Sequence, residues 1–587
     1  MAHFLHRPAP RAHSGLSFFH RAMLLAAPLL LAACGGGNSG SDATAAPSGF
    51  SVGYGTKAYH FSWTPTPNAT QYQLFEDPDG AAGPLPETQI GGAITSTTYT
   101  HSLAAQMLHE RVNATYRLRA CDANGCGPLT AAVTPDLTQA IGHFELPVGE
   151  PSRRLGDYKN AIALSADGAT LAVGSPSEVS SGGLAEAGAV YVFSRSMPDG
   201  VWSQQARLEG SSPTEKRAFG ASLALSADGG TLAVGAPEER SNARGINGDA
   251  SNRDAYGAGA AYVFTRSGGS WGQQAYVKSR NTPVKVETCT FDDITGVSAF
   301  PCTPQHFGFS VALSADGNLL AVAAPEEGAD FTQGTASASG RLSFISQTIF
   351  GGGKGAVHTF ARNNGAWAEQ AHLPGSNPDP GATRFGEVLA LSSDGSVLAA
   401  STDRDVSVLT RLGNAWSAPV PVWRVRAGEV DPRPFVLSGD GRTLAVLDRS
   451  VDFDVQLLTF TRTASAWEQQ PAFPVTVGIN ELFSAVLSLS EDGRTLALSN
   501  PYDASNAPGI NGNANNQDAS SAGAVNLYRR NGTTWAYSAY IKAPQPRALA
   551  RFGAGVALSG DASTLAVATS SARDGTKPAA PNAVYLY

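Results

Sequence analysis

The sequence is poor in charge and has little that indicates long helices. Asp, Glu, Lys and Arg make up only 15% of its 587 residues, and the formal net charge is −8. No Lys/Arg-rich run alternates with aromatic residues, so we predict no nucleic-acid partner, because such a partner requires clustered positive charge. Glycine is abundant instead, with 64 residues, and Val, Thr, Ser and Ala recur in short runs. This composition is typical of an all-β protein with many tight turns.

Residues that carry catalysis are also scarce. Only seven histidines follow Cys34, and four of them, His143, His306, His358 and His372, stand singly in different units of the repeat region. No Ser/His/Asp set, paired-carboxylate motif, Gly-x-Ser-x-Gly elbow or phosphate-binding loop accompanies them. We therefore predict that the protein is not an enzyme and has no catalytic residue, metal ligand or cofactor.

The N-terminus carries a targeting segment. Basic residues precede Ala22–Leu31, an apolar stretch of signal-peptide length that is too short to span a bilayer. The tetrapeptide 31–34, Leu-Ala-Ala-Cys, resembles the bacterial lipobox, which implies a signal peptide over 1–33 and a lipid on Cys34; an ordinary secretory signal is the alternative. Residues 34–46 then form a flexible linker rich in Gly, Ser and Ala. Because Gly35 stands where some sorted lipoproteins have Asp, the resemblance implies a surface-exposed, lipid-anchored protein of the outer membrane.

Five cysteines fit this oxidising destination. Besides Cys34, they form two locally spaced pairs, Cys121 with Cys126 and Cys289 with Cys302. No C-x-x-C motif is present and no histidine lies at ligand spacing from either pair, so we predict two disulfides in preference to a zinc site.

Residues 47–136 are predicted to be a small β-sandwich. Segments of period-2 alternation are separated by Pro, Gly, Asn and Asp, which is the pattern of short antiparallel strands. The stretches 61–63 (Phe-Ser-Trp), 72–74 (Tyr-Gln-Leu) and 116–121 (Tyr-Arg-Leu-Arg-Ala-Cys) resemble a fibronectin type III domain. The resemblance implies that Trp63 and Tyr116 pack in its core, and that the domain acts as a spacer or binder.

Residues 137–587 contain seven copies of one unit. Each copy has a strand, a short turn with one Asp, a buried Leu-Ala-Val-like strand, a variable loop and a Val-Tyr-Val-Phe-like strand; six copies add a last strand marked by Trp. The turn aspartates are Asp167, Asp228, Asp316, Asp394, Asp440, Asp492 and Asp561. Units of this size match four-stranded propeller blades, so we predict a seven-bladed β-propeller in which these aspartates form turns.

The Phe-Gly pairs at Phe219, Phe307, Phe385 and Phe552, together with Gly-Ala-Pro at 235–237, resemble the FG-GAP repeat of integrin α-subunit propellers. The integrin-type calcium loop is missing here, because the first two strands are joined only by the short Asp turn. The seventh unit ends at a third strand, 583–587. We predict that 142–147, just before the first unit, supplies its fourth strand and closes the ring, because a missing outer strand would leave an exposed edge.

The long insertions follow second and fourth strands, which places them on one face of a propeller. Two of them share a pattern of Asn and Asp in a Gly-rich loop. The candidate ligand-face residues are Asn242, Asn247, Asp249, Asp254, Asn506, Asn511, Asn513 and Asp518. These side chains either hold turns or, as the alternative, offer oxygen ligands to calcium.

Together these features predict a cell-envelope binding or adhesion module that contacts a protein or glycan ligand at the cell surface through its loop-rich face. The alternatives are a periplasm-facing scaffold of an outer-membrane assembly, and a propeller-type enzyme that acts on polysaccharide. Fold alone does not choose among them.

Overall fold

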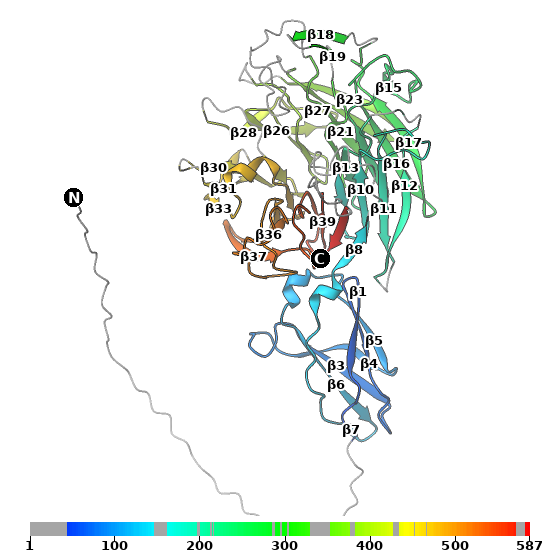
Figure 1. The fold of residues 1–587 in the computed structure, drawn as a ribbon, viewed down its shortest axis with the longest axis vertical. Coiled ribbons are helices and arrows are strands. Elements are labelled where there is room, and N and C mark those ends of the chain that lie inside the picture. Colours follow the sequence, from blue (N-terminus) through cyan, green and yellow to red (C-terminus); the bar gives the residue numbers. More distant parts are fainter. Residues whose placement is uncertain are drawn as a thin grey trace, which may run out of the picture. The chain divides into compact units, whose positions relative to one another are not determined.

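The computed structural model describes residues 44–145, 161–196, 200–211, 214, 217–283, 288–293, 296–301, 305–328, 353–375, 382–426, 434–450, 452, 454–464, 466–570 and 582–587 (Figure 1). The predicted signal peptide, Cys34 and most of the predicted linker lie outside these residues. The described part consists of antiparallel strands with short 3-10 helices at Leu108–Arg111 (η1), Leu137–Ala140 (η2) and Ile479–Ser484 (η5), so the predicted all-β class is confirmed. No helix in these ranges has the length and apolar character that a membrane crossing requires.

The N-terminal region has two facing sheets. One contains β1 (Ser51–Gly55), β2 (Ala58–Ser62) and β5 (Thr98–Ser102); the other contains β4 (Thr88–Ile94), β3 (Gln71–Asp77), β6 (Thr115–Asp122) and β7 (Gly125–Cys126). Alternate residues of β3 and β6 are buried, which is the period-2 pattern of a strand with one face in the core.

Aromatic side chains fill the space between these two sheets. Trp63 packs edge-on against Tyr72 with ring centroids 5.2 Å apart, and the Tyr116 hydroxyl donates a 2.7 Å hydrogen bond to Glu76. The predicted core positions of Trp63 and Tyr116 are therefore confirmed. Cys121 and Cys126 form a disulfide across β6 and β7, also as predicted.

The rest of the described chain forms seven antiparallel sheets whose strands pair mostly in sequence order. Sheets one to three contain β9 (Ile162–Leu164), β10 (Thr170–Ser175), β11 (Ala189–Arg195) and β12 (Trp202–Leu208); β13 (Ser222–Leu225), β14 (Thr231–Ala236), β16 (Ala260–Ser267), β17 (Ser270–Lys278) and β15 (Gly245–Ile246); and β20 (Val311–Leu313), β21 (Leu319–Ala324), β22 (Ala356–Asn363) and β23 (Ala366–Pro374). A separate hairpin, β18 (Thr288–Asp293) with β19 (Gly296–Pro301), lies between the second and third sheets in the sequence.

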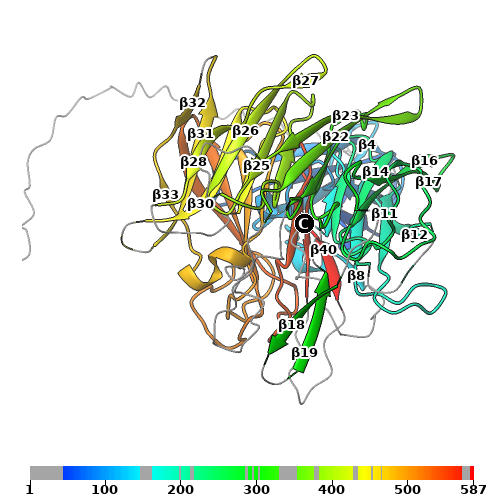
Figure 2. The same cartoon turned by 90° about the horizontal axis from the view of Figure 1, so that it is seen from above.

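Sheets four to seven repeat the plan. They contain β24 (Leu389–Leu391), β25 (Val397–Ser401), β26 (Asp405–Leu412), β27 (Ala415–Trp416) and β28 (Val420–Arg424); β29 (Phe435–Leu437), β30 (Thr443–Arg449), β31 (Val455–Arg462), β32 (Trp467–Gln469) and β33 (Phe473–Pro474); β34 (Leu487–Leu489), β35 (Thr495–Asn500), β36 (Ala524–Asn531) and β37 (Thr534–Ile541); and β38 (Gly555–Leu558), β39 (Leu565–Ala568), β40 (Ala583–Leu586) and β8 (Gly142–Glu145). Sheets that are neighbours in the sequence are also neighbours in space, since their first strands contact each other; Figure 2 shows the arrangement from above.

The second strand of each sheet is buried on both faces, as its continuous apolar run predicts. In β10 and β14 small residues let the neighbouring sheet come close. A Cβ at Gly174 would lie 2.0 Å from the carbonyl oxygen of Gly220, and one at Gly235 would lie 2.0 Å from that of Gly308. Glycine is therefore required at these two contacts between sheets.

The turn between first and second strands is held by its Ser and Asp. In all seven copies a Ser hydroxyl donates a hydrogen bond of 2.5–2.6 Å to the Asp two residues later. The turn role of these aspartates is therefore confirmed.

These turns also bind one another in a closed ring of backbone hydrogen bonds. In each turn one backbone amide donates to a carbonyl of the next turn, at 2.7–3.0 Å, and the seventh turn donates back to the first. The donor and acceptor pairs are Ala166 to Ala227, Ala227 to Ala315, Ala315 to Ser393, Ser393 to Gly439, Asp440 to Glu491, Glu491 to Gly560 and Gly560 to Ala166. The first strands contact each other in the same order, and β38 contacts β9. The arrangement therefore closes on itself.

The predicted closing strand is present. β8 pairs with β40 from Gly142 opposite Leu586 to Glu145 opposite Ala583. The Phe144 ring stacks on Phe193 of the first sheet, with centroids 4.8 Å apart. A segment that precedes all the repeats thus completes the last sheet and packs against the first.

The N-terminal sandwich packs on the last two sheets. Lys57, in the turn between β1 and β2, donates hydrogen bonds to the carbonyls of Ser563 and Tyr587 and to the Thr564 hydroxyl. Residues of the sandwich and of the sixth and seventh sheets belong to one continuous apolar core. The two regions therefore form one compact unit over 44–587.

Candidate functional site

The long insertions gather on one face of the ring. In a four-stranded antiparallel sheet the second and fourth strands run in the same direction, so the links that follow them leave from the same end of the sheet. We call the side of the ring formed by these ends the loop face. Contacts join these links: Arg244 Nε donates to the Thr282 carbonyl at 2.8 Å, and Asn281 Nδ2 donates to Glu327 at 2.7 Å. The opposite side carries the Ser-Asp turns.

The two loops of matching sequence are anchored alike. In the second sheet Lys278 Nζ donates to Glu239 at 2.7 Å, with both side chains buried. In the sixth sheet Lys542 Nζ donates to Asp503 at 3.0 Å. A buried ion pair is costly to break by removing one partner, so each loop is fixed at its base.

Most of the candidate ligand-face residues hold the loops in shape. Asn247 and Asn511 occupy the same place: each accepts a 2.9 Å hydrogen bond from the backbone amide of the neighbouring last strand, at Tyr276 and Tyr540. Both have positive φ, of 54° and 56°. At Asn247 and Asn511 the side chains therefore hold turns, which is one of the two roles that the sequence suggested for them.

The other six candidates lie in the same loops. Asn242 Nδ2 donates to Asp254 at 3.2 Å, and Asp249 and Asn513 each accept from the amide two residues later. The amides of Asn506 and Asp518 donate to Asn516. Calcium binding at these loops stays a prediction.

We expect Asn247→Ala to lower the free energy of unfolding by about 1–2 kcal/mol, because it removes the part-buried hydrogen bond from the Tyr276 amide and places alanine, which has no polar side chain, at positive φ. Asn247→Gly keeps the backbone conformation and should cost less. Urea unfolding of both variants measures the difference. Equal losses would mean that the φ angle contributes nothing.

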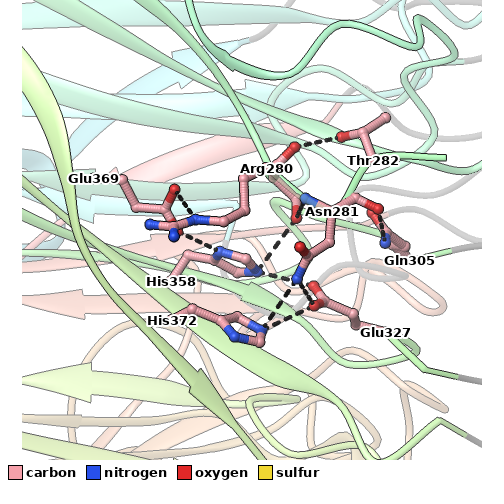
Figure 3. A network of polar contacts seen from close by, with 9 residues as sticks. Arg280, Asn281, Thr282, Gln305, Glu327, His358, Glu369 and His372 are labelled. Atoms are coloured by element: carbon pink, nitrogen blue, oxygen red, sulfur yellow. Dashed lines mark hydrogen bonds and ion pairs between the residues drawn. The ribbon is translucent and has the colours of Figure 1, made fainter. Parts of the chain in front are cut away.

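A cluster of two histidines and two glutamates lies on the loop side of the third sheet (Figure 3). His358 on β22 and His372 on β23 lie directly opposite each other, with ring centroids 4.7 Å apart. Glu327, in the link after β21, accepts from both: its carboxylate oxygens are 2.9 Å from His358 Nε2 and 2.9 Å from His372 Nε2. Glu369 on β23 is 3.2 Å from His358 Nδ1.

The prediction that these histidines stand singly in different units is wrong. The turn at Asn364 and Gly365 would set His358 opposite Ala371, but a β-bulge at Thr359 and Phe360 shifts the register by one residue, so that His358 lies opposite His372. The sequence did show that both histidines lie in one unit, between the turn aspartates Asp316 and Asp394. Glu327 carries no such signal, because it lies in a link with no periodic pattern.

Burial and ion pairing set the charges of this cluster. Burial alone would raise the pKa of Glu327, but the hydrogen bond and charge of His358 lower it to about 2. Burial opposes charge on His358, yet its two carboxylate partners raise its pKa. Arg280 Nε donates to Glu369 at 2.6 Å, and Asn281 Nδ2 donates to Glu327 at 2.7 Å. Both come from the link after the fourth strand of the second sheet.

A second charged group lies beside the first. His306 Nδ1 is 3.1 Å from Glu326, which also accepts a 2.7 Å hydrogen bond from Arg384. Although burial opposes it, the charge of Glu326 raises the pKa of His306 to about 8. Burial is likewise outweighed at Glu326, where His306 and Arg384 lower the pKa to about 2.

Of the other residues singled out in the sequence, the structure describes Cys289 and His143 but not Cys302. Cys289 lies on β18, whereas Cys302 is outside the described residues, so their disulfide stays a prediction. His143 on β8 stacks on Tyr585, and both line a cavity of about 290 Å³ with Arg547 and Gln545. In the part of the chain that the structure describes, Glu327, His358 and His372 are the one group of three or more His, Cys, Asp or Glu residues with ligand atoms close enough to share an ion.

Comparison with known proteins finds likeness in structure alone. No family model matches the chain, and no curated protein matches it. A periplasmic gluconolactonase of Pseudomonas aeruginosa is 15% identical, with a TM-score of 0.37, over 81% of this chain and 98% of that one. A candidate 6-phosphogluconolactonase of Bacteroides uniformis is 11% identical, with a TM-score of 0.37, over 81% and 98%. TolB of Acinetobacter baumannii is 10% identical, with a TM-score of 0.30, over 74% and 77%.

These neighbours are β-propeller-type proteins, which agrees with the all-β sheets described above. The prediction that the chain is not an enzyme is contradicted, because lactonases are enzymes and stand among the structures similar to it. At this level of likeness no substrate, reaction or site residue is carried over to this chain.

Proposed function

We propose that the protein is a lipid-anchored, extracytoplasmic binding protein whose loop face contacts a protein or glycan ligand. The observation that carries the proposal is the one-sided elaboration of the ring. The long links and the two histidine–glutamate groups lie on the loop face, whereas the opposite face has seven short Ser-Asp turns. Loops on a rigid scaffold are the usual place for recognition.

The finer fold assignment belongs to this proposal. We interpret the seven sheets as blades of one seven-bladed propeller of FG-GAP type. In support, the repeated Phe219, Phe307, Phe385 and Phe552 are buried, and each following glycine has a φ of 87–96°. We interpret the sandwich, with sheets β1-β2-β5 and β4-β3-β6-β7, as a fibronectin type III-like spacer between the anchor and the propeller.

Localisation and orientation are tested in whole cells. We expect the wild-type chain in the outer-membrane fraction and the Cys34→Ser variant in the soluble fraction. Proteinase added to intact cells should cleave the wild-type chain while a periplasmic marker protein stays intact. Protection of the chain until the outer membrane is opened would favour the alternative, a periplasm-facing scaffold.

Binding is tested by comparing the two faces. A variant in which 505–518 is replaced by a short Gly-Ser link should lose binding to surface proteins or glycans on an array. A matched variant, Asp228→Asn, alters a turn on the opposite face and should keep it. Equal binding by both variants would contradict recognition through this part of the loop face.

A further inference from the structure

We propose that Glu327, His358 and His372 form a binding site for a divalent transition-metal ion of the zinc class. Each residue offers one ligand atom, and the three atoms lie within 4.8 Å of one another. Two imidazole nitrogens and one carboxylate oxygen are a ligand set that zinc accepts in proteins.

The fold holds all three ligands in place. His358 and His372 are adjacent positions on paired strands, so their rings share one face of the hairpin. Glu327 is fixed by its backbone, since its amide donates to the Ala324 carbonyl at 3.1 Å and its carbonyl accepts from Gly355 at 3.1 Å. Both histidine Nε2 atoms therefore point to the same carboxylate (Figure 3).

The surroundings of His358 are those of a metal-bound histidine. Its Nδ1 faces Glu369 at 3.2 Å, and Glu369 in turn accepts from Arg280 at 2.6 Å. A carboxylate on the far nitrogen of a ligating imidazole fixes the ring and strengthens it as a donor. Glu369 lies outside the ligand triad, so it can hold the His358 ring from its Nδ1 side while Nε2 binds the ion.

The site favours zinc-class ions over calcium and stays open on one side. Calcium takes six to eight oxygen ligands, whereas this triad offers two nitrogens. His358 is fully buried, but the His372 side chain is 29% exposed. Asn281 lies beside the triad, with Nδ2 3.5 Å from His372 Nε2. A fourth ligand, water or a group of a bound molecule, can therefore reach the ion from the loop face.

The test is metal titration of the purified full chain after treatment with a chelator. We expect one equivalent of Zn²⁺ to bind by calorimetry, and Co²⁺ to give the visible absorption of a low-coordinate nitrogen and oxygen site. Glu327→Gln and His372→Ala should weaken binding by about 100-fold or more, and Glu369→Gln by about 10-fold. Circular dichroism confirms that each variant is folded.

The matched control is His143→Ala, which removes an exposed histidine of another sheet and should leave the affinity unchanged. Calcium in excess should not displace Co²⁺. The proposal is overturned if the wild-type chain binds no Zn²⁺ at millimolar concentration, or if Glu327→Gln and His372→Ala bind Zn²⁺ as tightly as the wild-type chain does. Displacement of Co²⁺ by calcium would also overturn it.

Discussion

The full chain with Gly142–Glu145 replaced by a Gly-Ser-Gly-Ser linker should melt about 10 °C or more below the wild type. The replacement removes the fourth strand of the last sheet and leaves β40 with an unpaired edge. It also removes the Phe144 ring from its contacts with Phe193 and Trp202 of the first sheet. Loss of a fully buried aromatic ring costs about 3–5 kcal/mol, so loss of the partly buried Phe144 should cost part of that, and the lost ladder of hydrogen bonds adds to it.

The ring geometry makes this effect larger than the removal of an ordinary edge strand. The first strands and their turns form a closed series of contacts, and β8 is the strand by which a segment before the first repeat is tied to the last sheet. Opening that link should loosen the first and last sheets together. We expect the unfolding transition to broaden as well as to shift.

The control is the pair of exposed substitutions His143→Ser and Glu145→Gln, which keep the backbone pairing of β8. Their melting temperatures, measured by circular dichroism at a fixed scan rate, should stay within a few degrees of the wild type. A Gly-Ser variant that melts like these controls would show that the ring does not depend on β8.

The all-β fold could be predicted from the sequence because the sequence contains seven copies of one structural unit. Each unit has the same Ser-x-Asp turn and the same Leu-Ala-Val-like strand. A turn or strand that is weakly indicated in one unit is therefore supported by the equivalent residues of the other units. The prediction that 142–147 closes the ring came from counting strands: six units have a fourth strand marked by tryptophan, whereas the seventh ends at its third strand. A rule about unpaired edges then indicated where the missing strand had to come from.

The cluster of Glu327, His358, His372 and Glu369 was missed because it depends both on the strand register within one hairpin and on links from two neighbouring sheets. The turn of the β22–β23 hairpin alone would set His358 opposite Ala371, and it is a β-bulge at Thr359 and Phe360 that pairs His358 with His372. The approach of Glu327, Arg280 and Asn281 depends on how two neighbouring sheets present their links. No spacing in the chain encodes that approach, so it required the three-dimensional structure.

The buried Lys57 should make the stability of the protein depend on pH in the alkaline range. Its side chain is 1% exposed where the sandwich meets the last sheets. Burial, with a smaller effect of the nearby Arg195, lowers the pKa of this ammonium group from 10.5 to about 7, against still smaller opposing effects of Asp561 and Glu110. The folded protein therefore releases a proton at a much lower pH than the unfolded chain does.

The sign follows from proton linkage. Between about pH 7 and pH 10.5 the unfolded chain binds more protons at this site than the folded protein, so stability rises with pH. The contribution is fully present above the unfolded pKa, decreases as the pH falls towards 7, and is constant below that. At about 1.4 kcal/mol for each unit of pKa, the change across this window is on the order of 5 kcal/mol.

Lys57→Met keeps the apolar length of the side chain and removes the titrating group. We expect the free energy of unfolding of the wild type, minus that of this variant, to increase by several kcal/mol between about pH 6 and about pH 10 in urea titrations. The exposed Lys354→Met serves as the control, and its difference from the wild type should stay flat over the same range. A flat difference for Lys57→Met would mean that Lys57 keeps its proton in the folded protein, held as an ammonium ion by the carbonyls of Ser563 and Tyr587 and the hydroxyl of Thr564.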